Sequence, residues 1–383
     1  MAFQREKQNV SAGDLLQALV DGEEIQLSQC AVTGVLDVNR LFDDAENFNI
    51  TNLNVQRANK IRTITLSQSV VFDKCLFEEN VVFTAPWADP DSVRVHFEKE
   101  VVFNSSHFKG QARFRSAVFD DTAGFDGCTI DGVVTFKGAQ VNGDAKFRTT
   151  TFNGYALFPN ITFRASARFT NSHIAKGINF SEARFLGPTD FSGVYSSSRA
   201  VPACDSVFFA RRRYGDDESF WRFVKQSALE AGYYHLAGEC FYNERCAGLW
   251  QKLRGGDYGK KGWSKVIAMI TKVRLLPELF LGRLLFGYGE RPVRVLVASA
   301  IVISLCAFYY AQPDVLAHRF GTGEGSFFEG LYFSMITFTT LGYGDLYPAA
   351  AGSCRIVAML EAVSGACLMA LFVVCLAKRF SRG

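Results

Sequence analysis

The chain has 383 residues and a net charge of +3 at pH 7, which is too small to indicate a nucleic-acid partner. Its polar, charged N-terminus is unlike a secretory signal peptide. The ten cysteines contain no CxxC pair, so we expect buried free thiols in a reducing compartment rather than a metal site.

The first half of the chain is strongly periodic. From Ile50 to Phe191 apolar residues return after alternately five and six positions, which gives a period of eleven residues. The stretch "PWADPDS" from Pro86 to Ser92 interrupts the pattern once. Small residues stand two positions before many of the phenylalanines, as Ala145 does before Phe147. An eleven-residue period is typical of a solenoid, in which each coil contacts only its neighbours.

This spacing resembles the pentapeptide-repeat family. The resemblance implies a right-handed quadrilateral β-helix with a stacked phenylalanine ladder, and we assign residues 27–195 to it, after an N-terminal segment or cap at 1–26. Some members of the family mimic DNA with an acidic surface. Between Ile50 and Phe191 there are 16 Lys and Arg against 14 Asp and Glu, so that function is not expected here. The solenoid is then expected to be a spacer, or a docking surface for an unknown cytoplasmic protein or ligand.

Residues 205–271 change to a helical pattern, which predicts a helical hairpin connector. Gly232 stands where a first helix should end and a second begin. We expect an aromatic face to pack on the end of the solenoid or on a neighbouring subunit; its members are Trp221, Phe241 and Trp250.

Residues 272–290 predict a short amphipathic helix. Pro277 suits its first turn, and Gly287 and Gly289 suit its end. An amphipathic helix immediately before an apolar segment is typical of the membrane interface. A helix of a soluble core is the alternative.

Residues 291–383 contain two segments, 293–311 and 356–377, that are each long and apolar enough to cross about 30 Å of hydrocarbon. Arginines and lysines flank the first segment at its start and the second at its end. The positive-inside rule therefore predicts a multi-pass protein of the cell inner (plasma) membrane with both termini, and the solenoid, in the cytoplasm.

A shorter helix is predicted at 327–338, between the two spans. Ser326 and Glu329 form a capping box at its start. Twelve residues are too few to cross the membrane, so this helix must enter the membrane and leave it on the same side. The sequence TLGYG follows the helix. Irregular backbone at membrane depth occurs only inside protein or along a water-filled cavity.

The segment "TTLGYGD", from Thr339 to Asp345, resembles the selectivity filter of potassium channels, and the whole module is similar to two-transmembrane-helix bacterial potassium channels. The family motif has valine where this chain has Leu341. The resemblance implies a homotetramer that transports ions and is not an enzyme, with no cofactor other than K⁺ ions in the filter. The filter is then made by Thr340, Leu341, Gly342, Tyr343 and Gly344.

Five residues are predicted to support the filter: Thr339, Asp345, Tyr332, Phe333 and Glu361. We expect Tyr343 to pack outward against Tyr332 and Phe333. As the only acid in either span, Glu361 should avoid lipid, and we predict that it hydrogen-bonds near Thr337 to Thr339. It is either a titrating element of the gate or a strut between helices. Gly365 is either a gating hinge, as the resemblance implies, or a close-packing position.

The sequence thus predicts a multidomain protein: a β-helix solenoid, a helical connector and an all-α two-span pore module with a re-entrant helix. Its predicted function is potassium-selective passive transport, with the solenoid as a regulatory or assembly module. The alternative is a membrane-tethered pentapeptide-repeat scaffold whose pore is non-conducting or weakly selective.

Overall fold

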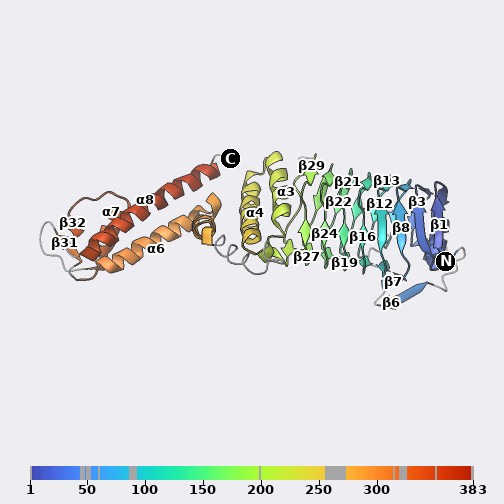
Figure 1. Cartoon of the computed structure of the whole chain (residues 1–383), viewed down its shortest axis with the longest axis horizontal. Helices are drawn as coiled ribbons and strands as arrows, with labels where there is room; N and C mark the ends of the chain where they lie inside the picture. The colour runs from blue at the N-terminus through green and yellow to red at the C-terminus, as the bar shows by residue number, and fades with distance from the viewer. Residues whose placement is uncertain are drawn as a thin grey trace, which may run out of the picture. The chain divides into compact units, whose positions relative to one another are not determined.

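The computed structural model describes residues 2–43, 48, 53–58, 61–85, 93–197, 200–254, 273–313, 315–318, 326–349 and 352–380. The chain forms two compact units, Met1–Asp257 and Tyr258–Gly383, and each is described by itself (Figure 1). Four predicted features lie outside the described residues: Ile50, the interruption at 86–92, the end of the connector at 255–271 and the first residue, 272, of the amphipathic helix.

Four sheets form the faces of the β-helix in the first unit, and their strands stack in parallel, apart from the antiparallel pair β6–β7 (Figure 1). The first sheet contains β1 (Ala2–Glu6), β3 (Glu24–Ser28), β8 (Val70–Asp73), β12 (Val101–Asn104), β16 (Ala123–Gly124), β20 (Ala145–Lys146), β24 (Ala167–Arg168) and β28 (Thr189–Asp190). The second contains β26 (Gly177–Asn179), β22 (Tyr155–Leu157), β18 (Val134–Thr135), β14 (Ala112–Arg113), β10 (Val81–Val82) and β5 (Leu36–Asp37).

The other two faces of the β-helix have eight strands each. The third sheet contains β30 (Phe208–Phe209), β27 (Arg184–Phe185), β23 (Thr162–Phe163), β19 (Gln140–Val141), β15 (Val118–Phe119), β11 (Val93–Phe97), β7 (Ile61–Leu66) and β6 (Asn54–Ala58). The fourth contains β2 (Asn9–Ser11), β4 (Ala31–Thr33), β9 (Leu76–Phe77), β13 (His107–Phe108), β17 (Thr129–Ile130), β21 (Thr151–Phe152), β25 (His173–Ile174) and β29 (Tyr195–Ser196).

One coil of the β-helix is 22 residues long, which is twice the period of the sequence. Ala123 pairs with Ala145, and Ala145 pairs with Ala167. Val70, in contrast, pairs with Val101. The coil between these two residues is therefore nine residues longer than a coil of 22, and the interruption of the sequence pattern lies within it. The insertion therefore lengthens one coil and leaves the register of the later coils intact.

Phenylalanine rings fill the axis of the β-helix in stacked columns. The ring centroids of Phe125 and Phe147 lie 5.2 Å apart, and those of Phe147 and Phe169 lie 4.8 Å apart, with the rings nearly parallel. Phe136, from the neighbouring face, meets Phe147 edge-on at 85°. Stacked and edge-on contacts both suit the charge distribution of an aromatic ring. The predicted phenylalanine ladder is thereby confirmed.

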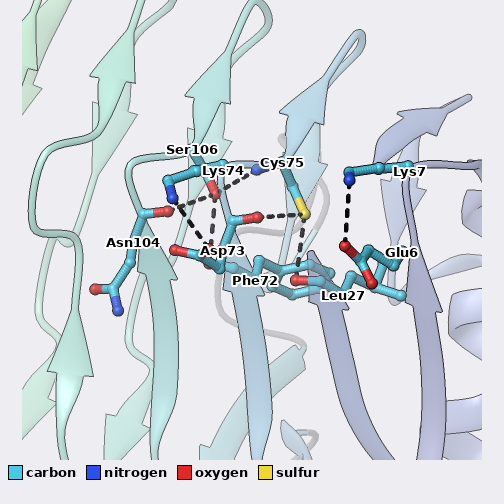
Figure 2. Close-up of polar contacts among 9 residues, drawn as sticks. All are labelled: Glu6, Lys7, Leu27, Phe72, Asp73, Lys74, Cys75, Asn104 and Ser106. Carbon is cyan, nitrogen blue, oxygen red and sulfur yellow. Dashed lines mark hydrogen bonds and ion pairs between the residues drawn. The ribbon is translucent and has the colours of Figure 1, made fainter. Parts of the chain in front are cut away.

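A second ladder, which we call the corner ladder, lines one buried corner of the β-helix. In it, a small side chain donates to a carbonyl oxygen of an adjacent coil: the Thr150 hydroxyl to Phe125, at 2.7 Å, and the Ser172 hydroxyl to Phe147. The other members, of which Figure 2 shows the first two, are Cys75, Ser106 and Cys128. Burial raises the pKa of the Cys75 thiol to about 11 and that of Cys128 to about 12. These two cysteines are thus packed hydrogen-bond donors.

The β-helix is longer at both ends than the predicted range of 27–195. At the start, β1 pairs with β3, and helix α1 (Ala12–Val20) is buried against the first coils. At the other end, β30 pairs with β27. Strands β1 and β2 and helix α1, which lie in the range 1–26 that we assigned to an N-terminal segment or cap, thus join the first coils of the β-helix. The first coil escaped detection because its buried residues are aliphatic, as Val10 and Ile25 are, and do not continue the phenylalanine pattern. Helix α2 (Arg40–Asp43) follows β5.

The connector is a helical hairpin, as predicted. The short η2 (Arg212–Tyr214) leads into α3 (Glu218–Glu230) and α4 (Tyr234–Arg254), with Gly232 between the helices at φ +79°.

Of the three predicted aromatic residues, Trp221 packs on the end of the solenoid, and packing of the other two on a neighbouring subunit stays a prediction. Phe220 of α3 caps the solenoid, with ring centroids 5.1 Å from Phe191 and 5.2 Å from Phe209, and Trp221 packs beside it. Phe241 instead lies between Lys225 and Arg245 on the hairpin itself. The half-buried Trp250 lies near the end of α4. Aromatic residues on both helices look equivalent in the sequence, and only the packing of α3 on the last coil distinguishes them.

The second unit is helical. It contains η4, a π-helical segment (Glu278–Leu285), η5 (Gly287–Gly289), α6 (Pro292–Tyr310), β31 (Leu316–His318), α7 (Phe327–Phe338), β32 (Leu346–Pro348) and α8 (Gly352–Phe380). Among the described residues, α6 and the stretch Ser353–Lys378 of α8 are long and apolar enough to cross a membrane. The bounds of α7 are those predicted, 327–338, whereas α8 extends beyond the predicted span at both ends.

Candidate functional site

The segment after α7 has an alternating backbone. Thr340, Gly342 and Gly344 have φ values of +57°, +52° and +77°, while Leu341 and Tyr343 between them do not have positive φ. Glycine adopts this left-handed conformation without the penalty that a Cβ imposes. A backbone that alternates between left- and right-handed residues turns successive carbonyl groups to the same side of the chain. The segment 340–344 can therefore present a row of oxygens.

The end of α7 holds the first residues of this segment. The Thr340 amide donates to the Thr337 carbonyl at 3.0 Å, and the Leu341 amide donates to the Ile336 carbonyl at 2.9 Å. The Thr339 hydroxyl donates to the Met335 carbonyl at 2.7 Å. These bonds satisfy carbonyl groups that a helix end otherwise leaves unpaired. The start of α7 is capped as predicted, since the Ser326 hydroxyl accepts from the Glu329 amide at 3.2 Å.

The far end of the segment is held by Asp345. The Tyr332 hydroxyl of α7 donates to the Asp345 carboxylate at 2.8 Å. The segment 340–344 is therefore connected to α7 at both ends. Because a tyrosine hydroxyl needs a partner of fixed geometry, this bond sets the distance between α7 and the outer end of the segment.

The aromatic residues around the segment do not all lie where the sequence predicted. The ring of Phe333 is 5% exposed and meets Tyr310 of α6 edge-on, with centroids 4.8 Å apart. It therefore braces α7 against α6, and its predicted packing with Tyr343 stays a prediction. In the single chain the side chains of Leu341 and Tyr343 are 62% and 69% exposed.

Glu361 of α8 is buried, and its hydrogen-bond partners differ from the predicted residues. It accepts a hydrogen bond from the Tyr310 hydroxyl at 2.8 Å and a short one from the Ser334 hydroxyl. Ser334 lies earlier along α7 than the predicted Thr337 to Thr339. Glu361 thus joins α6, α7 and α8 through one carboxylate. The sequence analysis did not identify Tyr310 and Ser334 as the donors. They could have been sought among the hydroxyl side chains of the neighbouring helices, because a lone buried acid requires hydrogen-bond donors.

Two glycines bring the helices of this unit into close contact. A Cβ at Gly365 of α8 would lie 2.1 Å from the Phe338 carbonyl oxygen, and one at Gly330 of α7 would lie 2.4 Å from the Ala307 carbonyl oxygen. Gly365, rather than Glu361, therefore occupies the place beside the end of α7. This contact supports the close-packing interpretation of Gly365, and the hinge interpretation stays a prediction.

The opposite end of α8 is tied to the turn before α6. The Lys378 ammonium donates to the Tyr288 carbonyl at 2.9 Å and pairs with the Glu290 carboxylate at 3.0 Å. Tyr288 has φ +55°, between Gly287 and Gly289. This second "GYG" lies in the short η5 just before α6. The same three residues therefore adopt two different structures in one chain.

Comparisons with known proteins follow the same division of the chain. Residues 295–382 match a family described as ion channel, and residues 93–140, 125–173 and 147–194 match pentapeptide repeats. The chain is 39% identical over 69 residues to two pore potassium channel b of Oryza sativa subsp. japonica, covering 17% of this chain and 19% of that protein. It is 33% identical over 87 residues to a protein of Rhodopseudomonas palustris named as a candidate potassium channel, covering 23% and 20%.

The chain thus spans about a fifth of the length of these curated relatives. No solved structure matches the chain. The matched repeats lie within the β-helix, from residue 93 to residue 194, and the ion channel match lies within the unit that holds the segment 340–344. The chain therefore combines pentapeptide repeats with a C-terminal domain that matches the ion channel family.

Proposed function

We propose that the chain forms a homotetrameric, potassium-selective pore for passive ion transport. The observation that carries the proposal is the alternating backbone of Thr340, Gly342 and Gly344 at the end of a short helix between two apolar spans. Rings of backbone carbonyl oxygens can replace the hydration shell of a K⁺ ion. The oxygens are those of Thr340, Leu341, Gly342 and Tyr343, with the Thr340 hydroxyl.

A complete ring requires several chains, because one chain supplies a single oxygen at each level. Closed cyclic symmetry is the usual way to build such a ring, and four copies are the number that the potassium-channel filter uses. The exposure of Leu341 and Tyr343 in the single chain supports an assembly in which neighbouring copies cover these side chains. The negative end of the α7 dipole lies beside the segment and favours a cation there.

The solenoid is the candidate regulatory or assembly module of this channel. The cations that flank both spans support a position in the plasma membrane with the solenoid and both termini in the cytoplasm. Lys378 supports a route along the chain from the connector to the pore, because it binds the last turns of α8 to the turn at Tyr288 and Glu290. Movement of that turn would then move the end of α8.

Ion flux through the full-length protein in liposomes tests the proposal. We expect K⁺ and Rb⁺ to pass, Na⁺ to be rejected, and Ba²⁺, which resembles a dehydrated K⁺ in size, to block. The variant Gly342→Ala should abolish selective flux, because alanine disfavours the left-handed conformation by about 1–2 kcal/mol. The matched control is Gly22→Ala, since Gly22 also has positive φ and open space around it but lies in the solenoid. Equal permeability to Na⁺ and K⁺ would contradict the proposal.

A further inference from the structure

Strand β1 is an open edge of the β-helix. It is the first strand of the first sheet, at the end of the β-helix away from α3, and among the described strands it pairs only with β3 (Figure 1). The opposite edge of the same sheet, at β28, is covered by α3, whose Ser219 hydroxyl accepts from the Phe191 amide at 3.0 Å. Four of the five residues of β1 are exposed. An exposed edge strand is a template for the backbone of another strand.

The groups that face the open edge belong to alternate residues of β1. The Lys7 amide donates to the Ser28 carbonyl at the end of β3, at 3.0 Å. In a parallel pair every second residue of a strand bonds with a given neighbour, so the amides of the even-numbered residues of β1 point away from β3. The Gln4 amide therefore faces the open edge. The Gln4 carbonyl accepts from the Arg5 guanidinium at 2.8 Å and has a second lone pair for an added strand.

A groove runs beside this edge, between β1 and α1, and we call it the edge groove. It has a volume of about 410 Å³, and its lining includes Phe3 and Arg5 of β1 and Val10 of β2. Phe3 and Arg5 are in register with Ile25 and Leu27, whose side chains are buried in the core, so their own side chains are on the inner face of the sheet. Every second side chain of a strand added to β1 would enter the edge groove.

The edge groove is acidic. Asp14, Asp21 and Glu23 line it, against one cation, Arg5. The Arg5 guanidinium lies 4.6 Å from the centroid of the Phe3 ring. Within the described part of the chain none of the three carboxylates lies in an ion pair, and Asp21 accepts a hydrogen bond from the Gln17 side chain at 3.0 Å. The charge of the groove therefore favours basic side chains.

We propose that the edge of β1 binds an extended polypeptide segment of another protein, with basic side chains at alternate positions. Its backbone would continue the first sheet beyond β1, and its lysine or arginine side chains would enter the edge groove toward Asp14, Asp21 and Glu23. Strand addition takes affinity from main-chain hydrogen bonds and specificity from pockets for alternate side chains. The proposal names a partner for the regulatory role of the solenoid and rests on that role; it does not depend on ion selectivity.

A second copy of this chain is a poorer occupant of the edge. If two β1 strands paired edge to edge, the two edge grooves would lie on the same face of the joined sheet. Each copy would then bring its three carboxylates beside those of the other, and like charges that face each other are destabilising. A basic segment instead neutralises the groove.

Peptide binding to the full-length protein in detergent can be measured without ion flux, so its failure is distinguishable from a failure of the proposed channel. The probe is a fluorescent peptide of alternating lysine and valine, and its affinity is measured by fluorescence anisotropy. We expect it to bind, and a peptide with glutamate in place of lysine to bind at least about tenfold more weakly. The lysine–valine peptide with its amides N-methylated along one edge should also bind more weakly, because it lacks the donors of an added strand.

Gln4→Pro removes the outward amide at a position where an edge strand tolerates proline. It should weaken binding of the lysine–valine peptide about fivefold, the effect of one or two hydrogen bonds. Gln4→Ala is the matched control, because it loses the same side chain, with its bond to Gln26 at 2.7 Å, and keeps the amide. It should leave the affinity unchanged. Thermal unfolding of both variants checks that the β-helix is intact.

The double variant Asp14→Asn, Asp21→Asn should weaken binding of the same peptide about tenfold and reduce its salt dependence. Glu78→Gln is the control, since Glu78 is an exposed acid of the β-helix that does not line the edge groove. The proposal is overturned if the lysine and glutamate peptides bind equally, or if Gln4→Pro and Gln4→Ala have equal effects. It is also overturned if Gln4→Pro reduces the number of chains per assembly in light scattering while the peptide affinity stays constant, since a second copy would then occupy the edge.

Discussion

Gly365 of α8 lies directly against the carbonyl oxygen of Phe338, the last residue of α7. A methyl group at position 365 would be 2.1 Å from this oxygen, far inside van der Waals contact. Phe338 is two residues from Thr340. The packing of α8 therefore bears on the position of the segment that we propose to be the selectivity filter.

Gly365→Ala should displace the end of α7, and we expect it to destabilise the pore module by about 1–3 kcal/mol, the usual effect of overpacking. If the displacement reaches Thr340, K⁺ over Na⁺ selectivity in liposomes should fall. Val363→Ile is the control, because it adds one carbon at a position of α8 that is 65% exposed. Unchanged selectivity with an altered open probability would instead favour the hinge interpretation of Gly365.

Glu361 should be essential for joining α6, α7 and α8. Glu361→Ala leaves the buried Tyr310 hydroxyl without its acceptor, at about 1–3 kcal/mol for an unsatisfied group, while the Ser334 hydroxyl keeps the Ile303 carbonyl at 2.9 Å. We expect a lower midpoint of thermal unfolding in detergent and a lower yield of assembled protein. Glu361→Gln keeps a carbonyl acceptor and should retain most of the stability.

The same pair of variants distinguishes a strut from a titrating group. If Glu361 titrates during gating, the pH dependence of K⁺ flux should disappear in Glu361→Gln. A pH profile identical to that of the unmodified protein would identify the residue as a strut between the three helices.

The corner ladder should contribute measurably to the stability of the β-helix. Thr150→Val removes the hydroxyl that donates to the Phe125 carbonyl, which still accepts from the Cys128 amide at 3.3 Å, so we expect a loss of about 0.5–1.5 kcal/mol in the free energy of unfolding. Thr151→Val is the control, because the half-buried Thr151 is the next residue along the chain and lies outside the hydrophobic core. Denaturant unfolding followed by circular dichroism would measure both. Equal losses would show that the ladder bonds contribute nothing specific.

The buried thiols of the corner ladder should be unreactive in the native protein. The pKa of Cys128 is raised to about 12 and that of Cys75 to about 11, so at pH 8 both thiols remain protonated and the reactive thiolate is scarce. We expect iodoacetamide to label these cysteines only after denaturation, as determined by peptide mass spectrometry. An introduced Thr151→Cys should label in the native state. Rapid native labelling of Cys128 would contradict the assigned burial.

A charge inside the solenoid should affect gating and leave selectivity intact. Phe147→Asp breaks two stacking contacts in the axis and buries a carboxylate, which should locally unfold the β-helix because each coil contacts only its neighbours. We expect an altered open probability in bilayer recordings with unchanged K⁺ over Na⁺ selectivity. Tyr155→Asp is the control, since Tyr155 is 52% exposed on a neighbouring strand. Identical open probability in both variants would argue against a regulatory solenoid.

The sequence by itself determined the features that depend on local pattern. The eleven-residue period predicted a solenoid, and the resemblance to pentapeptide repeats implied a phenylalanine ladder; the structure has both, with coils of 22 residues, twice the period. The two apolar segments, the capped short helix and the glycines of TLGYG predicted the order of elements in the second unit. In each case a short stretch of residues suffices to specify the backbone conformation.

Only the tertiary structure decided which distant residues meet. Val10 and Ile25 belong to the β-helix because their strands pair with later ones, and Phe220 is the cap because α3, and not α4, presents its face to the last coil. Glu361 meets Ser334 and Tyr310 for the same kind of reason. Close backbone contacts at Gly330 and Gly365 fix the positions of α6, α7 and α8 along one another. Such positions depend on the packing of whole helices, which no local pattern of residues specifies.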